Sequence, residues 1–243
     1  MKNSSTNRRQ SLKLLLMGLL GLGMQKALGK DKESEVSAIS PTPWPDLESM
    51  KIAYILFDKI TVLDFIGIYD PLSRIKSKGY MEDFSWDLCA MKGVVKDSFG
   101  LTMKVDKIAP NLAEYDMVIV PGGFGTRPLQ TNNEFLAWLK TAEEVTYKVS
   151  ICTGSLLLGA AGFLKDKVVT TNFKEYETVE KYCKTVSKDR IVEDGNVITA
   201  GAVASSLDMG LYLCEKLVGK ENAEEIRKSM DYYPSDYSVL QAE

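Results

Sequence analysis

The candidate nucleophiles of this sequence are its four cysteines. The chain of 243 residues contains no histidine that could activate a hydroxyl group in their place. A nucleophile activated by histidine, as in a Ser/His/Asp or Cys/His/Asp relay, therefore cannot be assembled from it. Zinc sites that depend on histidine are excluded for the same reason. No Cys-x-x-Cys pair indicates a metal ribbon or a thioredoxin-like redox motif. We expect neither a bound metal nor a cofactor.

Cys152 is the cysteine whose surroundings favour reactivity. It follows the apolar run 147–151 and precedes the sequence Thr-Gly-Ser, which predicts a strand, a sharp turn and a helix around it. Oriented N–H groups at the start of a helix favour the thiolate, so we expect a lowered thiol pKa. The backbone N–H groups of Gly123 and Thr153 are expected to form an oxyanion hole. The other cysteines lie in apolar strand or helix patterns typical of buried structural residues: Cys89, Cys183 and Cys214.

Asp64 is the acidic residue expected beside Cys152. Without histidine another group must move protons, and a carboxyl group near a thiolate has its pKa raised by repulsion between like charges. A protonated Asp64 could hydrogen-bond to the sulfur and donate a proton to a substrate. The alternative for Asp64 is structural, because an aspartate that opens a helix is a frequent N-cap. Capping is also the alternative for Thr153.

Strands and helices alternate along the rest of the sequence. Apolar runs predict strands over residues 51–57, 86–91, 116–120, 147–151, 168–171 and 191–199, with a hairpin over 94–105. Helical spacing predicts helices over 64–78, 132–145, 153–160, 173–182, 203–218 and 221–230. This alternation predicts an α/β domain with a mostly parallel sheet and helices on both faces. Ligands in such sheets bind beyond the carboxyl ends of the strands, where Asp64, the Gly122-Gly123 pair and Cys152 should meet.

Composition divides the chain into a leader, a linker, a domain and a tail. These segments are a signal peptide over 1–29, a proline-rich linker over 30–49, the α/β domain over 50–234 and a C-terminal tail over 235–243. In the leader Arg8 and Arg9 precede an apolar run over 14–24, which is too short to span a bilayer. The leader resembles a twin-arginine signal. We therefore expect an exported protein of the periplasm or cell envelope that meets the membrane only during export; a Sec signal and an uncleaved anchor are the alternatives.

The distribution of charge argues against nucleic acid as a partner. Of 30 basic and 33 acidic residues, five basic and no acidic ones fall within 1–29. The remaining chain is acidic, which does not suit binding to a phosphate backbone. A small-molecule substrate is the expected partner.

Several segments resemble the ThiJ/PfpI superfamily and, within it, the isonitrile hydratase branch. They are LFDKITVLDFIGIYDPL, VIVPGGFGT, SICTGSLLLGAAGFL, VTTNF and VEDGNVITAGAVASSLDMGLYL, and they span nearly the whole predicted domain. The resemblance implies a flavodoxin-like three-layer sandwich, a homodimer, and Cys152 as a nucleophile with Asp64 beside it. The chain departs from the branch at Asn172-Phe173, where His-Trp is usual, and at Ile68, where proline usually follows glycine.

These observations favour a cysteine-dependent enzyme that acts on a small electrophile. The best match is a hydro-lyase resembling isonitrile hydratase, in which Cys152 attacks the terminal carbon and Asp64 protonates it. One alternative is aldehyde chemistry like that of a glyoxalase or deglycase. Another is a non-catalytic stress domain in which Cys152 is oxidised as a sensor. The residues expected to line the substrate pocket are Gly122, Phe124, Asn172 and Phe173.

Overall fold

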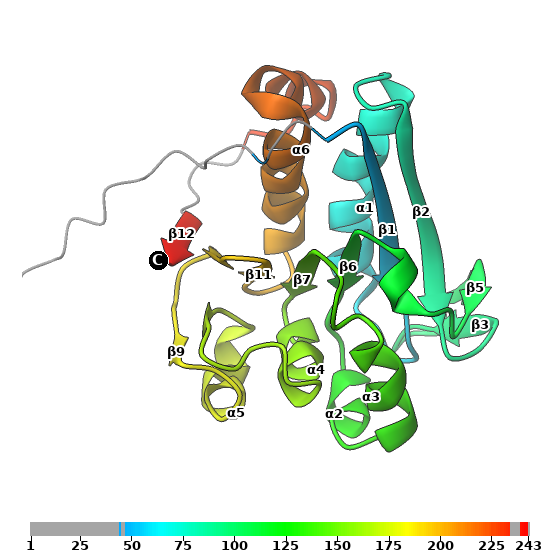
Figure 1. Ribbon diagram of the computed structural model, residues 1–243, viewed down its shortest axis with the longest axis vertical. Helices are drawn as coiled ribbons and strands as arrows, with labels where there is room; N and C mark the ends of the chain where they lie inside the picture. Colours follow the sequence, from blue (N-terminus) through cyan, green and yellow to red (C-terminus); the bar gives the residue numbers. More distant parts are fainter. Residues whose placement is uncertain (1–43, 45–46, 234–238, 243) are drawn as a thin grey trace, which may run out of the picture. The chain divides into compact units, whose positions relative to one another are not determined.

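The structure is a computed structural model that describes Trp44 and residues 47–233 and 239–242 (Figure 1). The predicted signal peptide over 1–29 lies outside the described residues, as does most of the predicted linker. Within the part of the chain that is described, no helix combines the length and the hydropathy that crossing a bilayer requires.

One central sheet organises the domain. Its eight strands are β1 (Ser49–Ile55), β2 (Asp83–Ala90), β5 (Lys107–Ile108), β6 (Met117–Val120), β7 (Tyr147–Ile151), β10 (Ile191–Asp194), β11 (Val197–Ala200) and β12 (Val239–Ala242). Their order is β12-β10-β11-β7-β6-β1-β2-β5, and every neighbouring pair is parallel except β10 with β11. Two small sheets pair β3 (Val94–Lys96) with β4 (Thr102–Lys104) and β8 (Val168–Val169) with β9 (Thr185–Val186). The predicted mostly parallel sheet is confirmed.

Helices lie on both sides of this sheet. They are α1 (Val62–Ser77), α2 (Thr126–Leu129), α3 (Asn133–Lys140), α4 (Gly154–Ala160), α5 (Tyr176–Glu180) and α6 (Ser205–Ser229), with 3-10 turns at η1 (Leu112–Glu114) and η2 (Phe173–Glu175). Figure 1 shows α1 and α6 together on one side of the central strands and α2 to α5 together on the other. Gly219, with a φ of 82°, interrupts α6, which therefore consists of two helices as predicted. The predicted α/β fold is confirmed.

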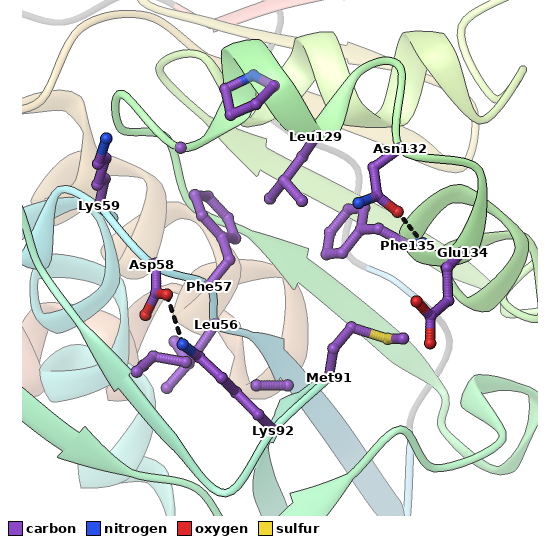
Figure 2. A pocket seen from close by; sticks show the side chains of 14 residues that line it. Leu56, Phe57, Asp58, Lys59, Met91, Lys92, Leu129, Asn132, Glu134 and Phe135 are labelled. Atoms are coloured by element: carbon purple, nitrogen blue, oxygen red, sulfur yellow. Dashed lines mark hydrogen bonds and ion pairs between the residues drawn. The ribbon is translucent and has the colours of Figure 1, made fainter.

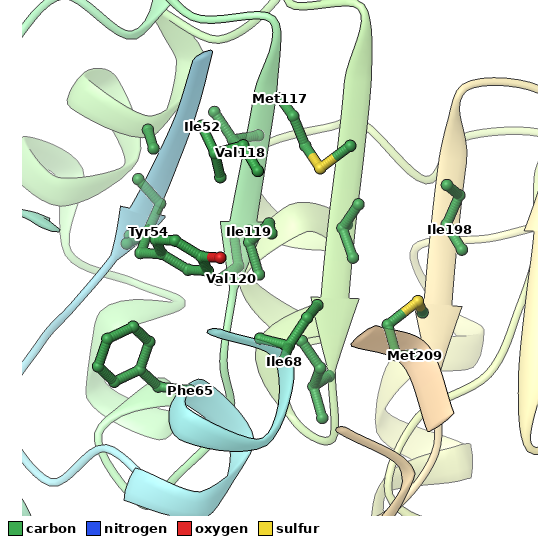
Figure 3. Close-up of a cluster of buried hydrophobic side chains, with 14 of the residues drawn as sticks. Ile52, Tyr54, Phe65, Ile68, Met117, Val118, Ile119, Val120, Ile198 and Met209 are labelled. Carbon is green, nitrogen blue, oxygen red and sulfur yellow. The ribbon is translucent and has the colours of Figure 1, made fainter. Parts of the chain in front are cut away.

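The core fixes α1 against the sheet and so sets the position of Asp64. All four residues of β6 are buried, as expected for a strand covered on both faces. Figure 3 shows Phe65 and Ile68 of α1 in one apolar cluster with Tyr54 of β1. The ring centroids of Tyr54 and Phe65 are 5.3 Å apart in an edge-to-face contact. Because Phe65 directly follows Asp64, this packing holds the first turn of α1 in place.

Most predicted ends shift by one to four residues, and three differences change an element itself or its length. The single strand predicted over 191–199 is a hairpin of two strands, because Gly195 adopts the left-handed conformation with a φ of 62°. The predicted C-terminal tail over 235–243 includes β12, which pairs in parallel with β10, so the domain extends beyond 234. The helix predicted over 132–145 ends at Lys140.

The end of the predicted linker over 30–49 is packed onto the domain. The indole ring of Trp44 stacks on Tyr147 with a centroid distance of 3.7 Å. The backbone N–H of Trp44 donates to the carbonyl of Lys216 at 3.3 Å. The prediction of an extended tether up to residue 49 is therefore wrong at this end, because a partly buried aromatic contact outweighs the local preference of the proline-rich segment.

Candidate active site

The predicted strand-turn-helix around Cys152 is present. Cys152 follows β7 directly and has a φ of 55°, a conformation that costs a residue other than glycine about 1–2 kcal/mol. Its backbone N–H donates to the carbonyls of Ala200 at 3.0 Å and Gly201 at 2.8 Å. A Cβ at Gly154 would lie only 1.9 Å from the carbonyl oxygen of Val120, so glycine is needed for the close approach of α4 to β6. The turn is thus held in a strained form that points the thiol into the site.

Asp64 is fully buried and reaches the same site from α1. The N-cap of α1 is Thr61, and Asp64 is the third residue inside the helix. The carboxylate Oδ2 accepts the backbone N–H of Gly122 at 2.9 Å, while Oδ1 has no hydrogen-bond partner among the described residues. The alternative that Asp64 is an N-cap is therefore wrong. Burial raises the pKa of Asp64 to about 7, against the opposing effects of the hydrogen bonds from Gly122 and Cys152.

The Gly122-Gly123 turn brings the carboxyl group and the elbow together. A Cβ at Gly122 would lie 2.6 Å from the backbone nitrogen of Thr153 and 2.8 Å from Asp64 Oδ2. Gly123 has a φ of 139°, and a Cβ there would lie 2.4 Å from the carbonyl oxygen of Lys59. Only glycine fits at either position, which explains the pair in the sequence.

The two backbone N–H groups predicted to form an oxyanion hole, those of Gly123 and Thr153, already have partners in this structure. The backbone N–H of Gly123 donates to Oγ1 of Thr153 at 3.0 Å. The backbone N–H of Thr153 interacts with the sulfur of Cys152 and lowers its pKa. The Gly123 donor is engaged because the Thr153 side chain folds back onto the glycine turn, a tertiary contact that the sequence did not indicate.

The prediction of a lowered Cys152 pKa is wrong. Burial, and next the negative charge of Asp64, raise the pKa of the thiol to about 11. The sulfur belongs to a residue only 4% exposed, and α4 has seven residues, so desolvation outweighs the field of a short helix. Hydrogen bonds from Asn172 and from the Thr153 N–H oppose the rise. With a pKa of about 7 for Asp64 and about 11 for Cys152, the carboxyl group is partly ionised at neutral pH and the thiol keeps its proton.

The residues predicted to line the pocket occupy different environments. Asn172 lies beside the thiol, with Nδ2 3.3 Å from Cys152 Sγ. Phe124 is 67% exposed and Phe173 61% exposed, so neither ring is enclosed. The guanidinium of Arg127 lies over the Phe124 ring, with Cζ 5.5 Å from its centroid.

Sequence reasoning missed the ion pair that supports the glycine turn. Arg127 donates to the carbonyl of Gly123 at 3.0 Å and to the carboxylate of Glu175 at 2.5 Å. The two charged residues lie 48 positions apart, and no local pattern marks them as partners. This pair ties the turn to the segment that follows Asn172.

A cavity of about 370 Å³ lies at the carboxyl ends of β1 and β2 (Figure 2). Figure 2 shows Phe57, Leu129 and Phe135 around it, with the ion pair of Asp58 and Lys92 at one side. Its lining contains neither of the two reactive groups and none of the four predicted pocket residues. The cavity is therefore a neighbour of the Cys152 site and not its interior.

The other cysteines differ from Cys152 in their surroundings. Cys89 on β2 and Cys214 on α6 are buried, and burial raises the pKa of both thiols. Cys183 is partly exposed in a turn after α5, so the prediction that it sits within a strand or helix is wrong. Among the described residues, no group of three or more acidic or cysteine side chains is placed to hold a metal ion.

Three features together define a class of α/β proteins with a cysteine elbow. They are a mostly parallel sheet, a cysteine at a strained strand-to-helix turn, and a buried carboxyl group beside that cysteine. The sequence model of the DJ-1/PfpI family matches residues 50–216. The chain belongs to the DJ-1/PfpI family.

Individual relatives agree with this assignment. The isonitrile hydratase of Pseudomonas putida is 32% identical over 189 residues, covering 77% of this chain and 80% of the relative. Protein DJ-1alpha of Drosophila melanogaster is 32% identical over 120 residues, covering 48% of this chain and 55% of the relative. The structure of a ThiJ/PfpI family protein from Pseudomonas syringae has a TM-score of 0.70 at 24% identity, covering 83% of this chain and 85% of that chain. At that identity, the structural likeness shows the fold alone.

Proposed function

We propose that this protein hydrates small isonitriles to N-substituted formamides, with Cys152 as nucleophile and Asp64 as proton carrier. The observation that carries the proposal is the buried thiol and carboxyl pair, whose members shift each other's pKa in a chain without histidine. Similarity to the isonitrile hydratase of Pseudomonas putida supports the substrate class.

The proposed reaction uses the ionised carboxyl group of Asp64 as the first acceptor of the thiol proton. As the sulfur of Cys152 attacks the terminal carbon of R–NC, the thiol proton passes to Asp64 and then to that carbon, giving the thioimidate R–N=CH–S–Cys. Water adds across the C=N bond, with its hydroxyl on carbon and its proton on nitrogen. The C–S bond then breaks, the thiol recovers its proton from the new hydroxyl group, and R–NH–CHO leaves. One isonitrile and one water are consumed, and no oxidant or reductant is required.

The limited access to the thiol also supports this substrate class. Cys152 is 4% exposed and Asp64 is fully buried, so a substrate must bring a slender group to the sulfur. The terminal carbon of an isonitrile is linear and carries no substituent. A glyoxal presents a wider, hydrated carbonyl group.

The test is a turnover assay on purified protein with n-butyl isonitrile, following N-butylformamide by NMR. Cys152→Ser should abolish turnover, because no histidine is present to activate a hydroxyl group. Asp64→Asn should lower the rate roughly 10²- to 10⁴-fold, the usual range for a general acid or base. Cys214→Ser is the matched control and should retain turnover. Equal rates in Cys152→Ser and the unmodified protein would refute the proposal.

Aldehyde chemistry is a second candidate, because the same thiol could form a hemithioacetal and Asp64 could carry its proton. The engaged donors around Thr153 and the narrow access argue for the isonitrile instead. Methylglyoxal, supplied in parallel, separates the two reactions. Redox sensing is less well supported, since oxidation requires an accessible thiolate and Cys152 is only 4% exposed.

We also propose that the protein is exported and forms a homodimer. Export rests on the twin-arginine-like leader, and recovery of a native N-terminus at Met1 from cytosol would contradict it. Dimerisation is supported by apolar side chains left exposed on α1 and around the β3–β4 hairpin, which are Leu63, Ile66, Phe99 and Leu101. Light scattering on the purified domain measures its mass directly.

A further inference from the structure

We infer that Asn172 is a catalytic residue that stabilises the Cys152 thiolate by donating an amide N–H directly to the sulfur. Nδ2 of Asn172 lies 3.3 Å from Sγ of Cys152. Oδ1 of the same side chain accepts the backbone N–H of Lys174 at 3.0 Å, as the N-cap of η2. An amide whose oxygen is already committed to a backbone N–H must turn its NH₂ group the other way, here toward the sulfur.

The segment that carries Asn172 is fixed to the elbow at a second point. Oγ1 of Thr171 donates to the carbonyl of Cys152 at 2.9 Å, and Oγ of Ser155 donates to Thr171 at 2.7 Å. All three of these hydroxyl and carbonyl groups are buried. The amide therefore meets the sulfur from a rigid support, which gives the hydrogen bond its direction without further ordering.

This donor matters because the other groups around the thiol oppose its ionisation. Burial and the charge of Asp64 both disfavour the thiolate, so donors to the sulfur are what counteract them. A neutral thiol is a poor acceptor, whereas a thiolate is a strong one, so the amide favours the ionised form. An amide does not titrate. The donor is consequently present at every pH, and this role holds whatever the substrate of Cys152.

The test is the pH dependence of Cys152 alkylation by iodoacetamide, mapped by mass spectrometry. Asn172→Ser keeps a side chain able to cap η2 but is too short to reach the sulfur. Asn172→Asp keeps the cap acceptor and replaces the donor with a negative charge. Loss of a hydrogen bond to a charged group should slow alkylation roughly 10- to 100-fold in Asn172→Ser at every pH below the thiol pKa of about 11. Asn172→Asp should slow it further.

The matched control is Asn132, which caps α3 by accepting the backbone N–H of Phe135 at 2.9 Å. Asn132→Ser removes an amide from an equivalent cap away from the sulfur and should leave the alkylation rate unchanged. A wider opening to the sulfur would speed alkylation, so slower alkylation is the deciding result. The inference is overturned if Asn172→Ser is alkylated as fast as the unmodified protein or faster. If Asn172→Ser does not fold, an unchanged rate in Asn172→Asp overturns it equally.

Discussion

The buried carboxyl group of Asp64 should make the protein less stable as pH rises, and Asp64→Asn should remove that loss. The pKa of Asp64 is about 7 in the folded state against an ordinary value of 3.8, so the folded protein binds this proton more tightly than the unfolded chain. The stability it contributes is fully present below pH 3.8 and is lost as pH rises to about 7. Asparagine keeps an oxygen to accept the Gly122 N–H and cannot ionise.

The size of the effect follows from the two pKa values. Each pKa unit corresponds to about 1.4 kcal/mol, and between pH 5 and pH 8 the Asp64 contribution falls by roughly 2–3 kcal/mol. The free energy of unfolding, measured by urea denaturation at several pH values, should therefore fall more steeply in the unmodified protein than in Asp64→Asn. Other titrating groups are common to both proteins and cancel in the difference. In thermal unfolding, the relative shift should be roughly 4–12 °C for a domain of this size.

Asp58 provides a control with the opposite sign. A hydrogen bond from Lys92 lowers the pKa of Asp58, so the stability contributed by this exposed pair is present near neutrality and lost as pH falls. Asp58→Asn should therefore remove the part of the stability loss on acidification that this carboxyl group causes. Parallel pH profiles of unfolding for Asp64→Asn and the unmodified protein would show that the Asp64 carboxyl ionises normally, and would also refute the proposed role of Asp64 beside Cys152.

Two further substitutions test the packing that positions the site. Gly154→Ala places a Cβ 1.9 Å from a strand carbonyl oxygen and should cost roughly 3 kcal/mol or more in urea denaturation, whereas Gly93→Ala, whose Cβ meets its nearest neighbour at 3.4 Å, should cost less than about 1 kcal/mol. Trp44→Ala removes the stacking on Tyr147 and should lower stability by roughly 1–2 kcal/mol, while Phe173→Ala, at a side chain 61% exposed and outside the proposed dimer surface, should change it by less than about 1 kcal/mol. Equal costs within either pair would contradict the contacts described.

The α/β fold and the meeting of Asp64 with Cys152 could be predicted because both follow from local patterns. Strands buried on both faces read as continuous apolar runs, and parallel connections place successive strand ends at one edge of the sheet. β6 and β7 were found in this way. The hairpin of β10 and β11 was missed although Gly195 between Asp194 and Asn196 is a local signal for a tight turn, whereas β12 escaped prediction because it pairs with a strand more than 40 residues away.

The electrostatics of the site could not be predicted from the sequence. The residue types around Cys152 indicated a helix N-terminus and hence a low thiol pKa, but the actual value depends on how deeply the sulfur is buried. The loss of Gly123 as a free donor depends on one rotamer of Thr153. Both properties depend on contacts between segments that are distant in sequence, so no local sequence pattern predicts them.

The contact between Trp44 and the domain indicates where a tag or a surface can be attached to this protein. Trp44 stacks on Tyr147, the first residue of β7, whereas Cys152 follows the last residue of the same strand. A strand of five residues is about 16 Å long, so the chain joins the domain at the end of the sheet away from the thiol. An affinity tag or an immobilising surface attached ahead of Trp44 should therefore leave the way to the sulfur clear, and the protein could be fixed to a solid support in a single useful orientation.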